Sequence, residues 1–197
     1  MSTMILKSAH IPGEIQLGTT LLYPTETVYG LGCRFDDAAA LQHIYRLKGR
    51  EAGVPVALIC DTIEWVKEHF RIPAHAMDLM NAHWPGALAM LLKPKRPELF
   101  GTLVYQEHVG VRVSGLALAR ELAKASGGAL VSTSANLSGE PTPLSWQDCP
   151  ASIRDGVSII IDGGSLRPSE PSTLIRITEA NAQNRGFDVI RQGSVRL

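Results

Sequence analysis

Short apolar runs and stretches of helical spacing alternate along most of this chain. Apolar runs bounded by turn residues predict buried strands, and such runs lie at 19–24, 28–35, 55–60, 87–92, 109–113, 129–134, 157–162, 172–177 and 187–191. Apolar residues three or four apart predict helices from Asp36 or Asp37 to about Lys48, and over 61–70, 73–83 and 115–126. Strands alternating with helices are typical of an α/β domain. Several late strands follow one another without a helix, so we expect an open, twisted mixed sheet with flanking helices.

The composition fits one globular domain over residues 1–197. The chain is 45% hydrophobic and 19% charged, which is ordinary for a folded protein. A chain of this length buries most of its apolar surface without disulfides or metals. The proline-containing loops at 139–143 and 167–171 are too short to be convincing linkers between domains.

The charge balance argues against a general affinity for nucleic acid. Lys plus Arg and Asp plus Glu both number 19, so the net charge is zero and no overall basic field is expected. A local basic patch remains possible, because a summed charge does not describe its distribution.

Cysteine and histidine usage predicts neither a disulfide framework nor a metal site built by the protein. Cys33, Cys60 and Cys149 are odd in number and have no CxxC spacing, and the six histidines are scattered. The first residues do not resemble a signal peptide. No apolar run approaches the ~20 residues of a membrane span, so we expect a cytoplasmic protein without a membrane partner.

The common nucleotide-binding motifs are missing. The sequence has no Gly-Lys dipeptide, which excludes a Walker A loop, and Gly30-Leu31-Gly32 lacks the third glycine of the dinucleotide fingerprint. If the protein uses ATP, it does so through another arrangement.

Two polar pairs are candidates for holding phosphates. Lys48 and Arg50 flank Gly49 at the end of a predicted helix, where two cations could grip a phosphate chain or simply complement the helix dipole. Ser134 and Asn136, with Ser132, follow an apolar strand and would share one face of an extended segment. That position suits ligand binding in α/β sheets, but an ordinary turn rich in Ser and Asn has the same composition.

Two further features suggest a small polar ligand. The segment 23–30 (YPTETVYG) carries several hydrogen-bonding side chains between two apolar strands, either as a ligand pocket or as an ordinary loop. Arg112 and Arg191 lie in otherwise apolar strands, where a cation needs an acidic partner or a bound anion.

Taken together, these segments resemble the YrdC/TsaC family, the L-threonylcarbamoyladenylate synthases, in their single-domain form with a YrdC-like fold. The matching segments, in family order, are YPTETVYGLG (23–32), LKGR (47–50), HWPGALAMLL (83–92), VGVRV (109–113), LVSTSANLSG (130–139), PSTLI (171–175) and IRQG (190–193). They span almost the whole chain.

The resemblance implies a role for each motif residue. The family's Lys-x-Arg and Ser-x-Asn pairs make Lys48, Arg50, Ser134 and Asn136 the expected catalytic residues. The expected ATP-binding residues are Lys48, Arg50, Ser132, Ser134, Asn136, Ser172 and Arg191, and the expected threonine-binding residues are Thr25, Thr27, Tyr29 and Arg112.

The resemblance also implies the reaction, a nucleotidyl transfer. L-threonine, bicarbonate and ATP, with Mg²⁺ carried by the nucleotide, would give threonylcarbamoyl-AMP and pyrophosphate for tRNA modification. The product would pass to downstream tRNA threonylcarbamoyl transferase proteins. The alternatives are an RNA-binding module and a carbamoyl-transfer paralogue of the family, and RNA contact is possible in either case.

The chain departs from the family pattern at a few positions. Glu51 and Ser114 stand where prolines are common, and Val54-Pro55-Val56 replaces the usual sequence of the 50–56 loop, a candidate lid. The chain also ends soon after IRQG, so we expect it to lack the C-terminal domain of longer relatives.

Overall fold

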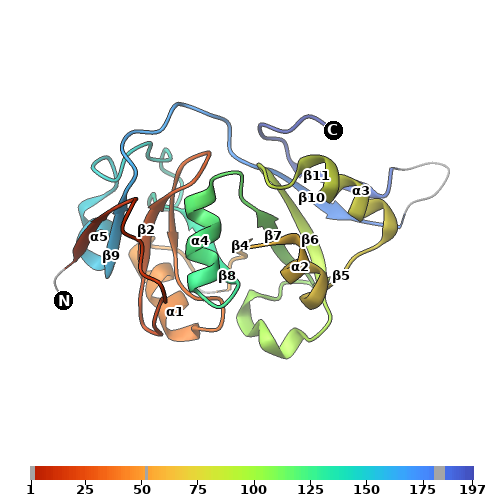
Figure 1. Ribbon diagram of the computed structural model, residues 1–197, viewed down its shortest axis with the longest axis horizontal. Helices are drawn as coiled ribbons and strands as arrows, with labels where there is room; N and C mark the ends of the chain where they lie inside the picture. Colours follow the sequence, from red (N-terminus) through yellow and green to blue (C-terminus); the bar gives the residue numbers. More distant parts are fainter. Residues whose placement is uncertain (1–2, 52, 180–184) are drawn as a thin grey trace.

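A single broad sheet organises the computed structural model of the protein (Figure 1). The structure describes residues 3–51, 53–179 and 185–197, so Ala52 of the candidate lid lies outside the described residues. The strands are β1 (Met4–Lys7), β2 (Leu21–Pro24), β3 (Tyr29–Gly32), β4 (Ala57–Cys60), β5 (Phe70–Arg71), β6 (Leu88–Pro94), β7 (Val109–Val113), β8 (Ala129–Ser134), β9 (Ile159–Asp162), β10 (Thr173–Ile177) and β11 (Phe187–Arg191).

The strand order is β1-β9-β2-β3-β8-β4-β7-β6-β10-β11, with β5 paired to β6. The sheet contains both parallel pairs, such as β4 with β7, and antiparallel pairs, such as β8 with β4. The expected mixed sheet is therefore confirmed. Its two edges are β1 and β11, which lie at opposite ends of the molecule in Figure 1.

Helices cover the two faces of the sheet unequally. The helices are α1 (Ala38–Leu47), α2 (Ile63–His69), α3 (Ala74–His83), α4 (Ala117–Ala125) and α5 (Ala151–Gly156), with two 3₁₀ turns at Pro97–Leu99 and Gly101–Leu103. Apolar side chains of α1, α2, α3 and α5 belong to the larger core cluster. Helix α4 packs on the opposite face, over β2, β4 and β8, in a smaller cluster. Among the described helices, none packs on the part of this face over β6, β7 and β10.

The sequence predicted the central elements better than the peripheral ones. Asp37 caps α1 as expected, because its carboxylate accepts a hydrogen bond from the Ala40 amide at 2.9 Å. Strand β1 and helix α5 were not predicted. Three of the four residues of β1 are exposed at the sheet edge, and α5 is only six residues long, so neither has the apolar pattern of a buried element.

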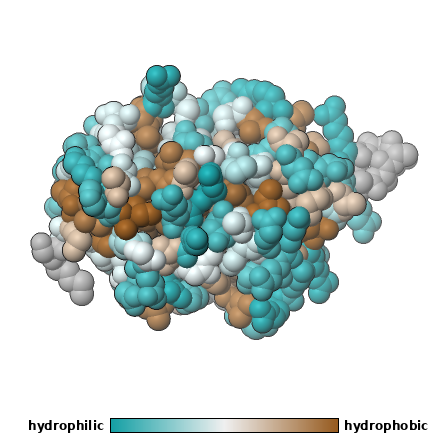
Figure 2. Space-filling view, viewed as in Figure 1, coloured by the Kyte–Doolittle hydropathy of each residue, from teal (hydrophilic) through white to brown (hydrophobic). Residues whose placement is uncertain are grey.

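Most of the surface on the face shown in Figure 2 is hydrophilic, with hydrophobic residues gathered in patches. Large exposed hydrophobic residues lie at both sheet edges, as Met4 and Ile5 on β1 and as Val189 and Ile190 on β11. None of the helices in the described parts of the chain has the length and apolar character needed to cross a bilayer.

Candidate active site

A cleft of about 430 Å³ lies on the part of the sheet that α4 leaves open. The strand register aligns its floor as one row across five strands, Ser132–Ala57–Gly110–Leu91–Arg176. Side chains in register on adjacent strands face the same side of a sheet. All members of this row line the cleft.

The cleft is open because the residues of its floor are small. Ala57 and Gly110 form the middle of the row, and Gly30 and Ala89 line the floor beside it. A Cβ added at Gly110 would lie 3.6 Å from Ala57 and from Leu91, so larger side chains here would fill the cleft. The volume is in the range of small-molecule sites, about 300–1,000 Å³.

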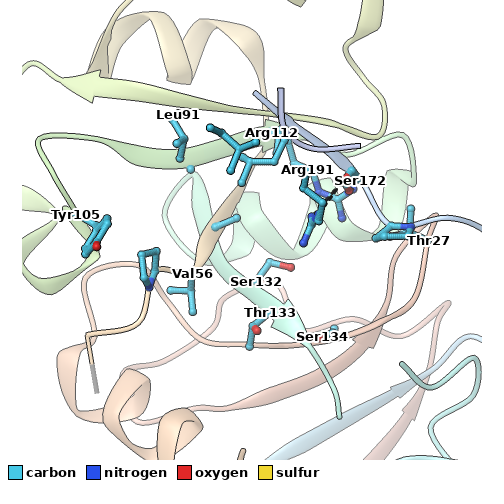
Figure 3. A pocket seen from close by; sticks show the side chains of 18 of the residues that line it. Thr27, Val56, Leu91, Tyr105, Arg112, Ser132, Thr133, Ser134, Ser172 and Arg191 are labelled. Atoms are coloured by element: carbon cyan, nitrogen blue, oxygen red, sulfur yellow. Dashed lines mark hydrogen bonds between the residues drawn. The ribbon is translucent and has the colours of Figure 1, made fainter. Parts of the chain in front are cut away.

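The cleft is strongly positive although the chain as a whole is neutral. Arg50, Arg112, Arg176 and Arg191 line it, and no Asp or Glu does so among the residues that the structure describes. Figure 3 shows Arg112, Arg191 and Ser172 on one side and Ser132, Thr133 and Ser134 on the other. Polar hydroxyl groups and guanidinium groups facing one space are suited to a ligand with several negative charges.

Arg112 is held by a buried network behind the cleft wall. Its Nη1 donates to Glu26 Oε1 at 2.8 Å and to Ser172 Oγ at 2.7 Å. Glu26 also accepts from the Ser114 hydroxyl and, at 3.2 Å, from the Gly115 amide. Burial acts to raise the pKa of Glu26, but Arg112 and these donors outweigh it and hold the pKa below its usual value. Within the described chain the Nη2 of Arg112 makes no hydrogen bond. This terminal nitrogen of the guanidinium is therefore available to a ligand.

Arg191 reaches the same wall through an irregularity in its strand. The pairing of β10 with β11 shifts register between Leu174 and Ile175, so Ile190 is an extra residue and Arg191 pairs with Leu174. The guanidinium of Arg191 donates to the Ser172 carbonyl at 3.0 and 3.2 Å. Burial, and then the nearby charge of Arg112, lowers the pKa of Arg191.

Lys48 lies directly behind the opposite wall. Its ammonium donates to the backbone carbonyl of Ser134, to that of Asn136 at 2.8 Å, and to Asn136 Oδ1 at 3.4 Å. All three acceptors are uncharged. Burial, followed by repulsion from Arg50, lowers the pKa of Lys48 to about 8. Lys48 is therefore a buried cation without an acidic partner among the described residues.

The turn after β2 presents one hydroxyl oxygen to the cleft. The Thr25 hydroxyl donates to the Val28 carbonyl at 2.7 Å, so its 3.1 Å contact with Thr27 must be donated by Thr27. The Thr27 hydroxyl oxygen can therefore only accept a further hydrogen bond. Both threonines line the cleft, and Thr27 lies at the end away from Tyr105 in Figure 3. This end of the cleft is suited to a ligand that donates a hydroxyl proton.

A family model described as "Telomere recombination", for Sua5, YciO and YrdC proteins, matches residues 14–193. The chain belongs to the Sua5/YciO/YrdC family. The likeness that the sequence motifs indicate is thereby confirmed.

Other members of this family resemble the chain along most of its length. The threonylcarbamoyl-AMP synthase of Pyrococcus abyssi is 34% identical over 169 residues, which are 85% of this chain and 49% of that protein. The threonylcarbamoyl-AMP synthase of Thiobacillus denitrificans is 35% identical over 182 residues, 89% of this chain and 95% of that protein. The crystal structure of P. abyssi Sua5 complexed with L-threonine matches with a TM-score of 0.79 and 28% identity, covering 98% of this chain and 58% of that one. The chain thus spans about half the length of the P. abyssi relative.

The fold brings most of the family motif residues to the cleft. The lining residues among those expected from the motifs are Thr25, Thr27, Arg50, Arg112, Ser132, Ser134, Ser172 and Arg191. Lys48 and Asn136 do not line the cleft. Lys48 donates to the Ser134 carbonyl and to Asn136 Oδ1, and the Asn136 amide donates to the Glu140 carbonyl at 2.6 Å.

Tyr29 is a third family motif residue that does not line the cleft. It is the first residue of β3 and lies between Val28 and Gly30, which both line the cleft. Because side chains alternate along a strand, Tyr29 faces the other side of the sheet. Its hydroxyl donates to the Gly164 carbonyl at 2.8 Å and accepts from the Gly163 amide at 3.0 Å. The threonine-binding role expected for Tyr29 is therefore not supported by its position.

The sequence analysis did not identify two residues of the site, Arg176 and Glu26. Arg176 lines the cleft opposite Leu91, and it is another arginine in an apolar strand, the signal that singled out Arg112 and Arg191. Glu26 holds Arg112, and the need of a buried arginine for an acidic partner could have pointed to it.

Proposed function

We propose that the protein is an L-threonylcarbamoyladenylate synthase, a nucleotidyltransferase that makes threonylcarbamoyl-AMP and pyrophosphate from L-threonine, bicarbonate and ATP. The observation that carries the proposal is the cleft lined by four arginines and no carboxylate within the described chain, continuous with a hydroxyl-lined end at Thr25 and Thr27. The names of the two relatives, and the L-threonine in the Sua5 complex, support the same reaction.

In the proposed reaction the threonine amine adds to CO₂ derived from bicarbonate and loses a proton, giving a carbamate. A carbamate oxygen then bonds to the α-phosphorus of ATP, and the bond to the bridging oxygen breaks to release pyrophosphate. Both partners are anions, so the main barrier that the protein must lower is electrostatic. Arg50, Arg191 and Lys48 offset this repulsion, and Ser134 orients the phosphates, while Asn136 holds the Lys48 ammonium behind Ser134. No covalent intermediate with the protein is needed.

We assign the two ends of the cleft to different parts of the substrates. Arg112 would hold the threonine carboxylate with its free Nη2, beside Thr25 and Thr27. The apolar side chains of Val56, Leu91 and Leu103 at the other end offer a surface for the nucleoside. Ser132 and Ser172 would contact the nucleotide between these ends.

The described residues offer no evident protein ligands for a magnesium ion. No carboxylate lines the cleft, and within the described parts of the chain there is no group of three His, Cys, Asp or Glu side chains placed to hold a metal. We therefore propose that Mg²⁺ arrives on the ATP phosphates as part of the substrate. The product would pass in the cytoplasm to the transferase proteins that modify tRNA.

ATP affinity is expected to depend on pH through Lys48. With a pKa of about 8, its ammonium is charged below pH 8 and loses its proton as the pH rises through that value. A phosphate chain binds the charged form, so the Kd for ATP should rise about 10-fold between pH 7 and pH 9. Isothermal titration calorimetry at each pH measures this, and a Lys48→Met variant should give a much flatter profile. A wild-type Kd that is constant over this range would contradict the assignment.

Amino-acid selectivity is the most direct test of the threonine end. A site that accepts a hydroxyl proton at Thr27 leaves that oxygen unpaired when the hydroxyl is missing, so valine should be rejected strongly. Serine loses only a methyl group, worth about 1 kcal/mol of burial, and should fall within roughly 10-fold of threonine. The measurement is amino-acid-dependent pyrophosphate release with each substrate. Equal turnover of valine and threonine would show that the cleft does not recognise the hydroxyl.

The same assay separates the proposal from its alternatives. An RNA-binding module would release no pyrophosphate, and a carbamoyl-transfer paralogue would release it without needing L-threonine. Strict dependence on L-threonine, bicarbonate and ATP together is the result that we expect.

A further inference from the structure

Tyr23 lies beneath the wall of the cleft with its hydroxyl toward the amino-acid end. It pairs with Gly30 in the antiparallel β2–β3 ladder, so its side chain faces the same side of the sheet as Gly30. A Cβ at Gly32 would lie 3.1 Å from Tyr23 Cε1, and one at Gly30 would lie 3.1 Å from Cζ and 3.4 Å from the hydroxyl. The ring therefore lies along β3 over two glycines, and its hydroxyl end is at Gly30, which lines the cleft.

This hydroxyl is fully buried and has no hydrogen-bond partner among the described residues. The Ser132 hydroxyl is near enough to lower the pKa of Tyr23 but is not positioned to pair with its hydroxyl. Buried polar groups are almost always paired, because an unmade hydrogen bond costs free energy that water would otherwise supply. An unpaired phenol beside a ligand cleft indicates that its partner is a ligand.

The surroundings of the hydroxyl indicate which ligand. Gly30 and Ser132 are its neighbours, and the methyl group of Thr25 lies beside Gly30 as well. All three residues line the cleft at the end that the proposed function gives to the amino acid. The positive charge of Arg112 also acts on the phenol. An anionic oxygen held by Arg112 would therefore lie near a buried donor that has no partner in the described chain.

We propose that the Tyr23 hydroxyl donates a hydrogen bond to an oxygen of the bound amino acid and so helps to select and position this substrate. The inference rests on the proposed function, since it takes the amino acid as the ligand of this end. Burial raises the pKa of Tyr23 well above its usual value, although Ser132 and Arg112 act in the opposite direction. The phenol therefore stays protonated at working pH and serves as a donor, not as a base.

The test is Tyr23→Phe, which removes the hydroxyl and keeps the ring over Gly30 and Gly32. Because the hydroxyl has no partner in the free protein, the melting temperature should stay the same or rise by a few degrees. The Kd for L-threonine should rise about 10-fold, and the Kd for ATP should not change. Stability and substrate affinity thus move independently, which a purely structural role would not produce.

Tyr29→Phe is the matched control for stability. The Tyr29 hydroxyl is bonded to Gly163 and Gly164, so its loss should lower the melting temperature by about 2–4 °C. If Tyr23→Phe lowers the melting temperature as much as Tyr29→Phe, the Tyr23 hydroxyl is already paired in the free protein and the proposal is overturned. Unchanged threonine affinity in Tyr23→Phe also overturns it.

Titration of the wild-type protein with L-threonine separates a failure of the proposed function from a failure of the role assigned to Tyr23. If the wild-type protein does not bind L-threonine, the proposed function fails, and this inference fails with it. If the wild-type protein binds L-threonine and Tyr23→Phe binds it equally well, only the role of Tyr23 is wrong.

Discussion

Replacement of Arg50 or of Lys48 by alanine is expected to reduce threonylcarbamoyl-AMP formation by at least ~100-fold, in line with the loss of one preorganised charge contact. Arg50 lines the cleft and is held by the Pro55 carbonyl at 3.1 Å, so it is already in place before a nucleotide binds. Lys48 adds a buried positive charge directly behind Ser134. The measurement is L-threonine-dependent pyrophosphate release at saturating substrate.

Arg46→Ala is the control for these variants. Arg46 lies exposed in the last turn of α1, close in sequence to both residues but outside the cleft lining. Its loss removes the same charge from the chain and should leave turnover near the wild-type rate. Wild-type turnover in Lys48→Ala or Arg50→Ala would refute the phosphate site, and an equal loss in Arg46→Ala would show a nonspecific effect of charge.

Arg112→Ala is expected to raise the KM for L-threonine about 100-fold while changing the KM for ATP much less. The free half of the guanidinium is the proposed grip on the threonine carboxylate, and losing one partner of a desolvated charge pair typically costs several kcal/mol. Steady-state kinetics with each substrate varied in turn gives both constants. Parallel increases in the two constants would place Arg112 outside the amino-acid site.

The alanine variant carries a stability risk that a second variant removes. Without Arg112 the buried Glu26 carboxylate loses its ion pair, and an unpaired buried charge is destabilising. The double variant Arg112→Met with Glu26→Gln removes both charges and should recover thermal stability. It should still fail to bind L-threonine tightly. Recovery of threonine affinity in the double variant would show that Arg112 acts through stability alone.

The sequence predicts the strands of this fold well because the central strands are buried on at least one face. The run at 109–113, for example, is β7 with every residue buried, and its apolar pattern is unambiguous. Strand β1 is exposed at an edge, and its four residues carry no comparable pattern. The predicted strand at 28–35 is shorter in the structure, ending at Gly32, since an apolar pattern locates an element better than its ends.

The candidate site is predictable where it depends on local spacing and not where it depends on register. Lys48 with Arg50, and Ser134 with Asn136, are each close in sequence, and the family motifs indicate them directly. The ion pair of Arg112 with Glu26 joins residues 86 positions apart in the chain. The position of Arg176 opposite Leu91 follows from the β6–β10 pairing. Neither contact can be derived from one segment alone.

The cleft is a depression in one continuous sheet, and this has a consequence for the lifetime of the product. Its floor from Ser132 to Arg176 is tied by ladder hydrogen bonds through every intervening strand, so its two walls cannot swing together about a hinge as two domains would. The mixed anhydride of the proposed reaction hydrolyses in water. Shielding from water then falls to the loops along the rim and to the ligands that fill the cleft. Such a construction favours rapid transfer of the product to the next protein over its storage in solution.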